Sequence, residues 1–147
     1  MGRLQNQMIE EFKGEYNFLS NFWTAEVTLD GQEYKTVEHA YQAAKTFIPS
    51  ERREVREASS PGKAKKLGRK VTLRSDWSEV RIQIMTELVR QKFTKYYNLK
   101  LSLIATGDKY LQEGNYWGDS YWGYDLKLNR GENNLGKILM KIRKELL

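Results

Sequence analysis

The chain has 147 residues, about the size of one domain, and is long enough to bury a core without covalent staples. It has no Cys and a single His, which excludes a disulfide framework, a thiolate zinc site, a cysteine nucleophile and a multi-histidine metal centre. No apolar run approaches the roughly 20 residues of a membrane span, and the N-terminus lacks the apolar core of a signal peptide. We therefore expect residues 1–147 to form a single cytoplasmic domain without membrane contact.

The positive charge of the chain is concentrated in one segment. Lys and Arg number 25 against 19 Asp and Glu, for a net charge of +6. Residues 52–74 carry nine basic and two acidic side chains, so this segment alone has a net charge of +7. A local cluster of this kind favours an anionic partner, and nucleic acid is one candidate. A solvent-exposed helical face is the alternative interpretation.

The first regular elements are predicted to be a hairpin followed by a helix. Residues 25–29 alternate apolar and polar, Asp30-Gly31 is typical of a tight turn, and residues 32–34 return as the second strand. Thr36 is expected to cap a helix that Pro49 ends. The apolar stripe of this helix is formed by Val37, Ala40, Tyr41, Ala44 and Ile48.

The rest of the chain is predicted to be mostly helical. Helices are expected over residues 50–58, over residues 63–67 behind the Ser60-Pro61 start signal, after Asp76, from Leu99 to Ile104, and from about Asn134. The core stripe of the long helix after Asp76 comprises Val80, Ile84, Leu88, Val89 and Phe93, and that of the last helix comprises Leu135, Ile138, Leu139, Ile142 and Leu146. A strand is expected at residues 110–113, before an aromatic- and glycine-rich loop. The fold class is therefore helix-rich α+β with a small β-sheet.

A polar row on the first helix is the sharpest candidate for a site. Glu38, Gln42 and Lys45 are spaced i, i+4 and i+7, which places them on one face beside the apolar stripe. An acid, an amide and an amine on one face of a mostly buried helix suggest a functional site. The alternative is helix-end electrostatics, with Glu38 in the first turn and Lys45 near the last.

Single residues and loops offer weaker signals. His39 is more often a hydrogen-bonded structural residue than a catalyst in this setting, and it has no partner at a spacing that would bind metal. The loop at residues 115–124 holds five aromatic side chains in ten residues, including Trp117 and Trp122. Such rings either cover a core or stack on a flat heterocycle, and the same two alternatives apply to Trp77.

Several motifs together resemble the NADAR family of YbiA-like N-glycosidases, whose name refers to NAD and ADP-ribose. The matching stretches are FLSNF at residues 18–22, TVEHAYQAAK at 36–45, SP at 60–61, AKKLGR at 64–69, DW at 76–77, TGD at 106–108, WGD at 117–119 and GENNLGKILM at 131–140. Each motif is short, but their order and spacing cover about residues 12–146. The resemblance implies an α+β, YbiA-like fold and hydrolysis of the bond between a base nitrogen and a ribose carbon.

The resemblance also implies a substrate class and a set of site residues. The expected substrates are phosphoribosylated pyrimidines of riboflavin synthesis or ADP-ribosylated guanine, with no cofactor and no metal. Glu38 is expected to stabilise positive charge on the ribose or to activate water, Lys45 is an alternative nucleophile that would form a Schiff base, and Asp119 would assist proton transfer to the base. Expected substrate contacts are Asn21, Phe22, His39, Gln42, Arg69, Trp77, Trp117, Gly118, Trp122 and Asn133.

Two rival functions fit the same residues. A non-catalytic module could recognise ADP-ribose or a nucleotide, and a nucleic-acid-binding protein could use the basic segment at residues 52–74. The sequence does not choose between a free metabolite and a modified nucleic acid, and no feature of it indicates an oligomeric state.

Overall fold

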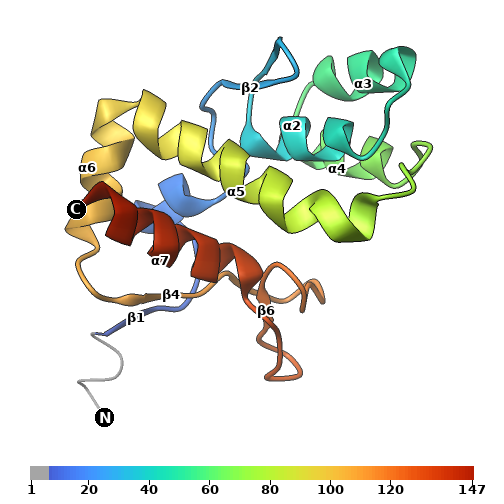
Figure 1. The fold of residues 1–147 in the computed structure, drawn as a ribbon. Coiled ribbons are helices and arrows are strands. Elements are labelled where there is room, and N and C mark those ends of the chain that lie inside the picture. Colours follow the sequence, from blue (N-terminus) through green and yellow to red (C-terminus); the bar gives the residue numbers. More distant parts are fainter. Residues whose placement is uncertain (1–6) are drawn as a thin grey trace. The chain divides into compact units, whose positions relative to one another are not determined.

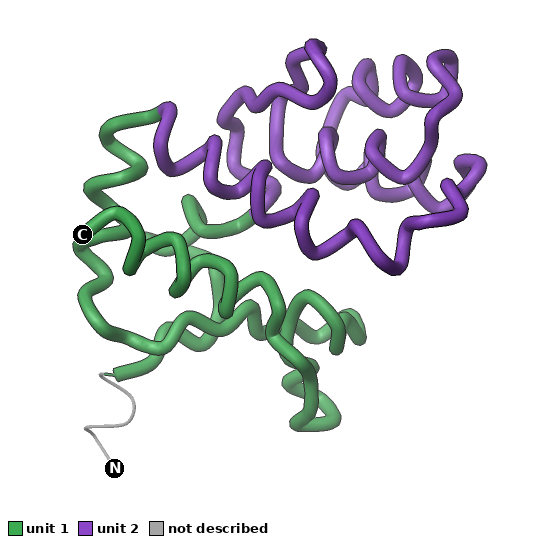
Figure 2. Tube along the Cα trace, viewed as in Figure 1, with its two compact units in different colours: residues 1–20, 96–147 green, residues 21–95 purple. Residues whose placement is uncertain are grey.

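The computed structural model describes residues 7–147, and their contacts divide into two compact units (Figure 2). Of the described residues, one unit comprises residues 21–95, and the other comprises residues 7–20 together with residues 96–147. Within the described residues, helices dominate and the strands form three two-stranded pairs. The predicted helix-rich α+β class is confirmed, although the small sheet is replaced by these separate pairs.

The unit of residues 21–95 begins with the predicted hairpin. Strands β2 (Val27–Leu29) and β3 (Gln32–Tyr34) pair antiparallel. Asp30 and Gly31 both adopt positive φ angles, 48° and 82°, as a type I′ turn requires. Asp and Gly tolerate this conformation better than most residues, so the turn chemistry fixes the register of the hairpin.

Helix α2 (Val37–Ala44) lies at the centre of this unit, and all of its residues are buried (Figure 1). The Thr36 hydroxyl accepts a hydrogen bond of 3.0 Å from His39 N, which confirms the predicted cap. The helix ends earlier than predicted, so the placement of Ile48 in its apolar stripe is wrong. Thr46 Oγ1 accepts a hydrogen bond from Ile48 N where the chain leaves the helix, and Ile48 is exposed.

Two short helices pack against α2. Helices α3 (Pro49–Arg56) and α4 (Pro61–Gly68) both begin with proline, and Ser60 caps α4 by accepting a hydrogen bond from Lys63 N. Gly68, predicted to end α4, lies in its last turn. A Cβ at this position would lie 1.9 Å from Gln42 Oε1, so glycine is what allows α4 to approach α2 here.

The long helix α5 (Trp77–Lys95) completes this unit and also contacts α2. The predicted stripe is confirmed at its C-terminal half, whereas Val80 and Ile84 are only half-buried. Met85 and Lys92, which were not predicted to be buried, lie in the core together with Leu88, Val89 and Phe93.

The other unit is built around helix α7. Helices α6 (Tyr97–Ala105) and α7 (Asn134–Leu146) pack together, and α7 also packs on β4 (Tyr110–Leu111). Strand β4 pairs in parallel with β1 (Met8–Ile9), and it is shorter than the predicted strand at residues 110–113.

The same unit contains the glycine- and aromatic-rich loop. This loop holds the parallel pair β5 (Gly114–Asn115) and β6 (Tyr124–Asp125), and a 3-10 helix, η1, covers Gly14–Leu19 earlier in the chain. Among residues 7–147, no helix is both long enough and apolar enough to cross a membrane.

Candidate active site

The predicted polar row on α2 is present in the structure. Glu38 is buried, with 8% of its surface exposed, and its Oε2 accepts a hydrogen bond of 2.6 Å from Gln42 Nε2. Lys45 follows as the C-cap of the helix and is half-buried. The negative charge of Glu38 acts on the Lys45 ammonium group and favours its protonated form. Helical spacing therefore brings an acid, an amide and an amine together, as predicted.

The amide of Gln42 is held in one orientation and has an unused acceptor. Because Nε2 donates to Glu38, Oε1 must lie on the other side of the amide, facing Gly68. Gln42 is buried, and Oε1 has no hydrogen-bond partner among residues 7–147. A buried acceptor in this state is costly, and such groups in native proteins call for an explanation. This atom is enclosed against Gly68, so the predicted substrate contact of Gln42 would need the side chain to move.

Burial lowers the pKa of the Lys45 amine. The negative charge of Glu38 opposes this shift, and the positive charges of Arg69 and Lys65 add to it. A lowered pKa increases the fraction of neutral amine at a given pH, and only the neutral amine can act as a nucleophile. The environment of Lys45 therefore suits both roles considered for it, a cation beside Glu38 and a nucleophile.

Aromatic side chains flank the row. The Tyr41 ring contacts both Lys45, whose Nζ is 5.7 Å from the ring centroid, and Trp77, whose ring centroid is 5.1 Å away. Trp77 is buried, with 7% of its surface exposed, so most of its ring packs inside the protein. This arrangement favours the core alternative for Trp77, and its contact with substrate stays a prediction.

His39 has a structural set of hydrogen bonds. Its Nε2 lies 3.0 Å from the carbonyl oxygen of Ala58, which can only accept, so this nitrogen carries the proton. Its Nδ1 accepts from the Thr36 hydroxyl at 2.8 Å, and burial lowers the pKa of the ring. The imidazole thus ties the start of α2 to the chain after α3, and a substrate contact would have to break one of these bonds.

Asn21 and Phe22 lie just before the hairpin and differ in exposure. Asn21 is buried, its carbonyl oxygen accepts from Glu38 N at 3.1 Å, and its Nδ2 donates to Met85 Sδ at 3.4 Å. Asn21 therefore fixes the first turn of α2 and, with it, the position of Glu38. Phe22 is 43% exposed and lies at the surface.

Asp119 holds the aromatic loop in shape. Its Oδ1 accepts hydrogen bonds from the backbone N–H groups of Tyr121 and Trp122, at 3.1 and 2.9 Å. The Asn115 side chain bonds both the N–H and the carbonyl oxygen of Asp119, at 3.0 and 2.8 Å. One carboxylate oxygen of Asp119 is thus committed to the loop, and the predicted proton transfer would use the other.

Asn133 connects β4 to α7 and is almost fully buried. Its Nδ2 donates to the Leu111 carbonyl oxygen at 2.9 Å and to the Tyr110 hydroxyl at 3.1 Å. Its Oδ1 accepts from Glu113 N at 2.9 Å. Both N–H groups of the amide are engaged, so a contact with phosphate or ribose, as predicted for Asn133, would have to displace protein groups.

The two tryptophans of the loop differ. Trp117 is 67% exposed, and the following Gly118 adopts a φ of 88°, which favours glycine. Trp122 is half-buried, and its ring lies edge-on to Tyr121 at a centroid distance of 4.9 Å. An exposed indole at a loop tip is the arrangement expected of a stacking surface, so Trp117 is the better candidate for contact with a heterocycle.

Sequence analysis missed a buried lysine on α5. Lys92 is 1% exposed, and burial lowers its pKa to about 7. The available signal was its spacing, because it follows Leu88 by one helical turn and continues that stripe. The predicted stripe names only apolar residues and therefore omits Lys92. Among residues 7–147, no group of three or more His, Cys, Asp or Glu is placed to hold a metal ion.

Comparisons with known proteins identify the family. The NADAR domain model matches residues 9–147. The chain is 37% identical to N-glycosidase YbiA of Escherichia coli (strain K12) over 134 residues, which cover 90% of this chain and 82% of that protein. It is 39% identical to N-glycosidase Npun_R5314 of Nostoc punctiforme over 137 residues, 89% of this chain and 86% of that protein.

A longer relative and a solved structure agree with this match. The riboflavin biosynthesis protein VVA0006 of Vibrio vulnificus is 36% identical over 89% of this chain, which spans 36% of that protein. The NMR structure of the E. coli protein YbiA superposes with a TM-score of 0.81 at 33% identity, covering 95% of this chain and 88% of that one. The matches run through the α2 row and the aromatic loop alike, and the chain belongs to the NADAR domain family.

Proposed function

We propose that this protein is an N-glycosidase that hydrolyses the bond between a ring nitrogen of a heterocycle and the anomeric carbon of a phosphoribose or ADP-ribose. Membership of the NADAR family and the relatives named N-glycosidases support the reaction class. The observation that carries the proposal is the row on α2, where a buried carboxylate bonds a fixed amide and acts on an amine of lowered pKa.

In the first route, Glu38 acts directly on the reacting centre. As the bond from the anomeric carbon to the ring nitrogen breaks, its electron pair stays on the nitrogen and positive charge builds on the ribose. The Glu38 carboxylate stabilises this charge and accepts a proton from the attacking water. The water oxygen becomes the anomeric hydroxyl, and the departing nitrogen takes up a proton, for which Asp119 is the candidate donor.

In the second route, the Lys45 amine attacks the anomeric carbon. The heterocycle leaves with the electron pair and is protonated, the ribose ring opens as its ring oxygen takes a proton, and a Schiff base joins the sugar to Nζ. Water then hydrolyses the Schiff base to the free sugar and the amine. The lowered pKa of Lys45 supports this route, and Glu38 would again move the protons.

The remaining candidates have binding roles in the proposal. Arg69, whose charge acts on Lys45, would hold phosphate, and Gln42 would hold the Glu38 carboxylate in position through its Nε2. Trp117, with support from Trp122, would stack on the heterocycle. His39 and Asn133 would act mainly by fixing α2 and the loop, given their bonds to protein groups.

Two substrate classes follow from the proposal. Relatives named riboflavin biosynthesis proteins support a phosphorylated ribosyl-pyrimidine, a free metabolite. The basic segment at residues 52–74 supports ADP-ribosylated guanine within nucleic acid, because phosphate contacts dominate such binding. Either substrate would be met in the cytoplasm, where the sequence is expected to act.

Side-by-side turnover of the two substrate types by purified protein tests this proposal. Release of free heterocycle is followed by chromatography, with the Glu38→Gln variant as the matched control because it removes the charge and keeps the shape. We expect turnover of at least one substrate and its loss in the variant. Binding without turnover, with the same affinity in both proteins, would replace the enzyme by a non-catalytic nucleotide-binding module.

A further inference from the structure

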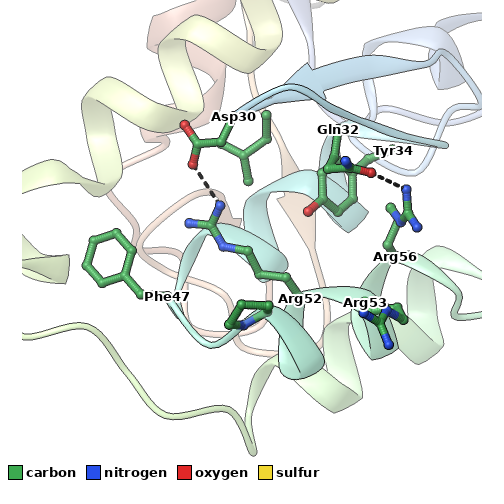
Figure 3. Close-up of a pocket in the computed structure, with 9 residues that line it drawn as sticks. Asp30, Gln32, Tyr34, Phe47, Arg52, Arg53 and Arg56 are labelled. Carbon is green, nitrogen blue, oxygen red and sulfur yellow. Dashed lines mark hydrogen bonds and ion pairs between the residues drawn. The ribbon is translucent and has the colours of Figure 1, made fainter.

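A pocket of about 350 Å³ opens between the β2–β3 hairpin and helix α3 (Figure 3). Its polar lining is dominated by arginine: Arg52, Arg53 and Arg56 lie on one side, and Asp30 and Tyr34 on the other. None of the residues of the α2 row lines it. The volume falls at the lower end of the range for small-molecule sites, enough for a phosphate and part of its carrier.

Arg52 is fixed in the pocket and only partly satisfied. Its Nε donates to the Thr46 carbonyl oxygen at 2.6 Å, and its Nη1 pairs with Asp30 Oδ2 at 2.7 Å. Its Nη2 is buried and has no hydrogen-bond partner among residues 7–147. A buried guanidinium N–H without an acceptor is a group that calls for a partner.

The carboxylate beside Arg52 is a weak competitor. The Asp30 side chain is 66% exposed and sits at the tip of the hairpin turn, so its ion pair with Arg52 is screened by solvent. An anion entering the pocket can take the place of Asp30 on Nη1 of Arg52. Its contact with this nitrogen is a charge-assisted hydrogen bond, the stronger kind.

The two other arginines add positive charge and form no ion pair among residues 7–147. Arg56 Nη1 donates to the neutral amide oxygen of Gln32, and Arg53 is exposed. Tyr34 also lines the pocket (Figure 3), and burial raises the pKa of its hydroxyl while the charges of Arg52 and Arg56 oppose this shift. The lining of the pocket therefore combines three guanidinium groups with one tyrosine.

We infer that this pocket is a phosphate-binding site, separate from the α2 row, that takes a phosphate group of a nucleotide or of a nucleic-acid strand. Three arginines face one exposed carboxylate, so the pocket carries a net positive charge. The exposed Phe47 ring at its edge, 64% exposed, offers an apolar surface to the group that carries the phosphate. A shallower hollow beside Arg56, lined also by Glu33, Lys35 and Glu57, has balanced charge and is not part of the site.

Amide chemical shifts of the full chain, titrated with three probes, test this inference. The probes are inorganic phosphate, adenosine monophosphate and a short single-stranded oligonucleotide without modification. We expect saturable shifts at Tyr34, Phe47 and Arg53 with phosphate. Tighter binding of the mononucleotide than of the strand, compared per phosphate, indicates a free nucleotide as the ligand, and the reverse order indicates nucleic acid.

Three substitutions that change charge distinguish a specific phosphate-binding site from a generally basic surface. Arg53→Gln and Arg56→Gln should each weaken phosphate binding about fivefold or more, because each removes a charge-assisted donor. Asp30→Asn should tighten binding, since it removes the competing charge while asparagine keeps the positive φ of the turn. Lys66→Gln is the matched control: it removes the same charge from an exposed residue of the basic segment that does not line the pocket.

The inference is overturned if phosphate causes no saturable shift at the pocket, or if Lys66→Gln weakens binding as much as Arg56→Gln. It is also overturned if Asp30→Asn weakens binding. The pocket does not depend on the glycosidase reaction, so these titrations and the turnover assay can fail separately.

Discussion

Polar side chains have different hydrogen-bond partners on helix α2 and in the aromatic loop, which is taken here as residues 114–133. In the loop, Asn115, Asp119 and Asn133 direct their amides and carboxylates to backbone groups and fix the path of the chain. On α2, Glu38 bonds another side chain, and the Oε1 of Gln42 bonds no group among the described residues. The loop side chains bind the backbone and fix its path, whereas Glu38 and Gln42 bond each other on one face of α2.

Among the substitutions that test this contrast, replacement of Lys45 should have the largest effect, and the quantity it changes is turnover. Lys45→Met keeps the aliphatic stem and removes the amine, and if Lys45 is the nucleophile we expect turnover to fall by about 10²-fold or more. Borohydride added during turnover should then trap a sugar adduct on Lys45 of the unmodified protein, located by peptide mass spectrometry. A mild loss without any adduct would select the water route through Glu38.

The position of the trapped sugar adduct also distinguishes Lys45 from Lys92, the two lysines whose pKa is lowered. Lys92 has a lowered pKa, but it is almost fully buried, so we expect no adduct there. An adduct on Lys92 would show that the polar row does not mark the reactive amine.

Lys92 should make the stability of the protein depend on pH. Its pKa is about 7 in the folded protein and near 10.5 when unfolded, so the unfolded state binds the extra proton between these values. The free energy of unfolding should therefore rise with pH across this window and be lower at neutral pH. Denaturant unfolding at pH 7 and pH 9 should show a rise of about 2–3 kcal/mol. The rise should shrink in Lys92→Met, and an equal rise in both proteins would assign it to other groups.

In the loop, Asn133→Asp tests a structural role. The substitution keeps the shape and one acceptor but removes the two N–H donors that join Asn133 to β4, so unfolding free energy should fall by about 1–3 kcal/mol. Asn129→Asp is the matched control, because Asn129 is exposed and its φ of 53° is close to the 52° of Asn133. A stable variant with raised KM would instead support the predicted contact with ribose or phosphate.

Replacement of Trp117, an exposed residue of the same loop, should have the smallest effect on stability. Trp117→Ala should change the free energy of unfolding by no more than about 0.5 kcal/mol, because the ring is largely exposed. If Trp117 stacks on the heterocycle, kcat/KM should fall by about tenfold or more, chiefly through KM. Tyr116→Ala, at the neighbouring exposed ring, serves as the control, and equal losses in both variants would argue against a specific stack.

Local patterns in the sequence were sufficient for the hairpin and for the polar row. The Asp30-Gly31 turn and the Thr36 cap act within a few residues, and helical spacing alone aligns Glu38, Gln42 and Lys45. The end of α2 lies earlier than the Pro49 stop signal predicts, because the chain already turns at Thr46, whose hydroxyl accepts from Ile48 N.

Features that depend on distant residues could not be predicted in this way. The partner of the His39 ring is a carbonyl oxygen at Ala58, and the arginine pocket needs the hairpin and α3 side by side. The basic segment at residues 52–74 was visible as a single cluster. The structure divides it between the arginines of α3 at the pocket and the residues Lys65 and Arg69, whose charges act on Lys45.

The central claim is that the Glu38 carboxylate acts in bond cleavage and is not needed for the fold. The most direct test compares turnover and melting temperature of the unmodified protein and Glu38→Gln, with whichever substrate the protein cleaves. The account predicts a loss of turnover of about 10²-fold or more at a nearly unchanged melting temperature. Turnover close to that of the unmodified protein, by a variant that melts at the same temperature, would contradict it.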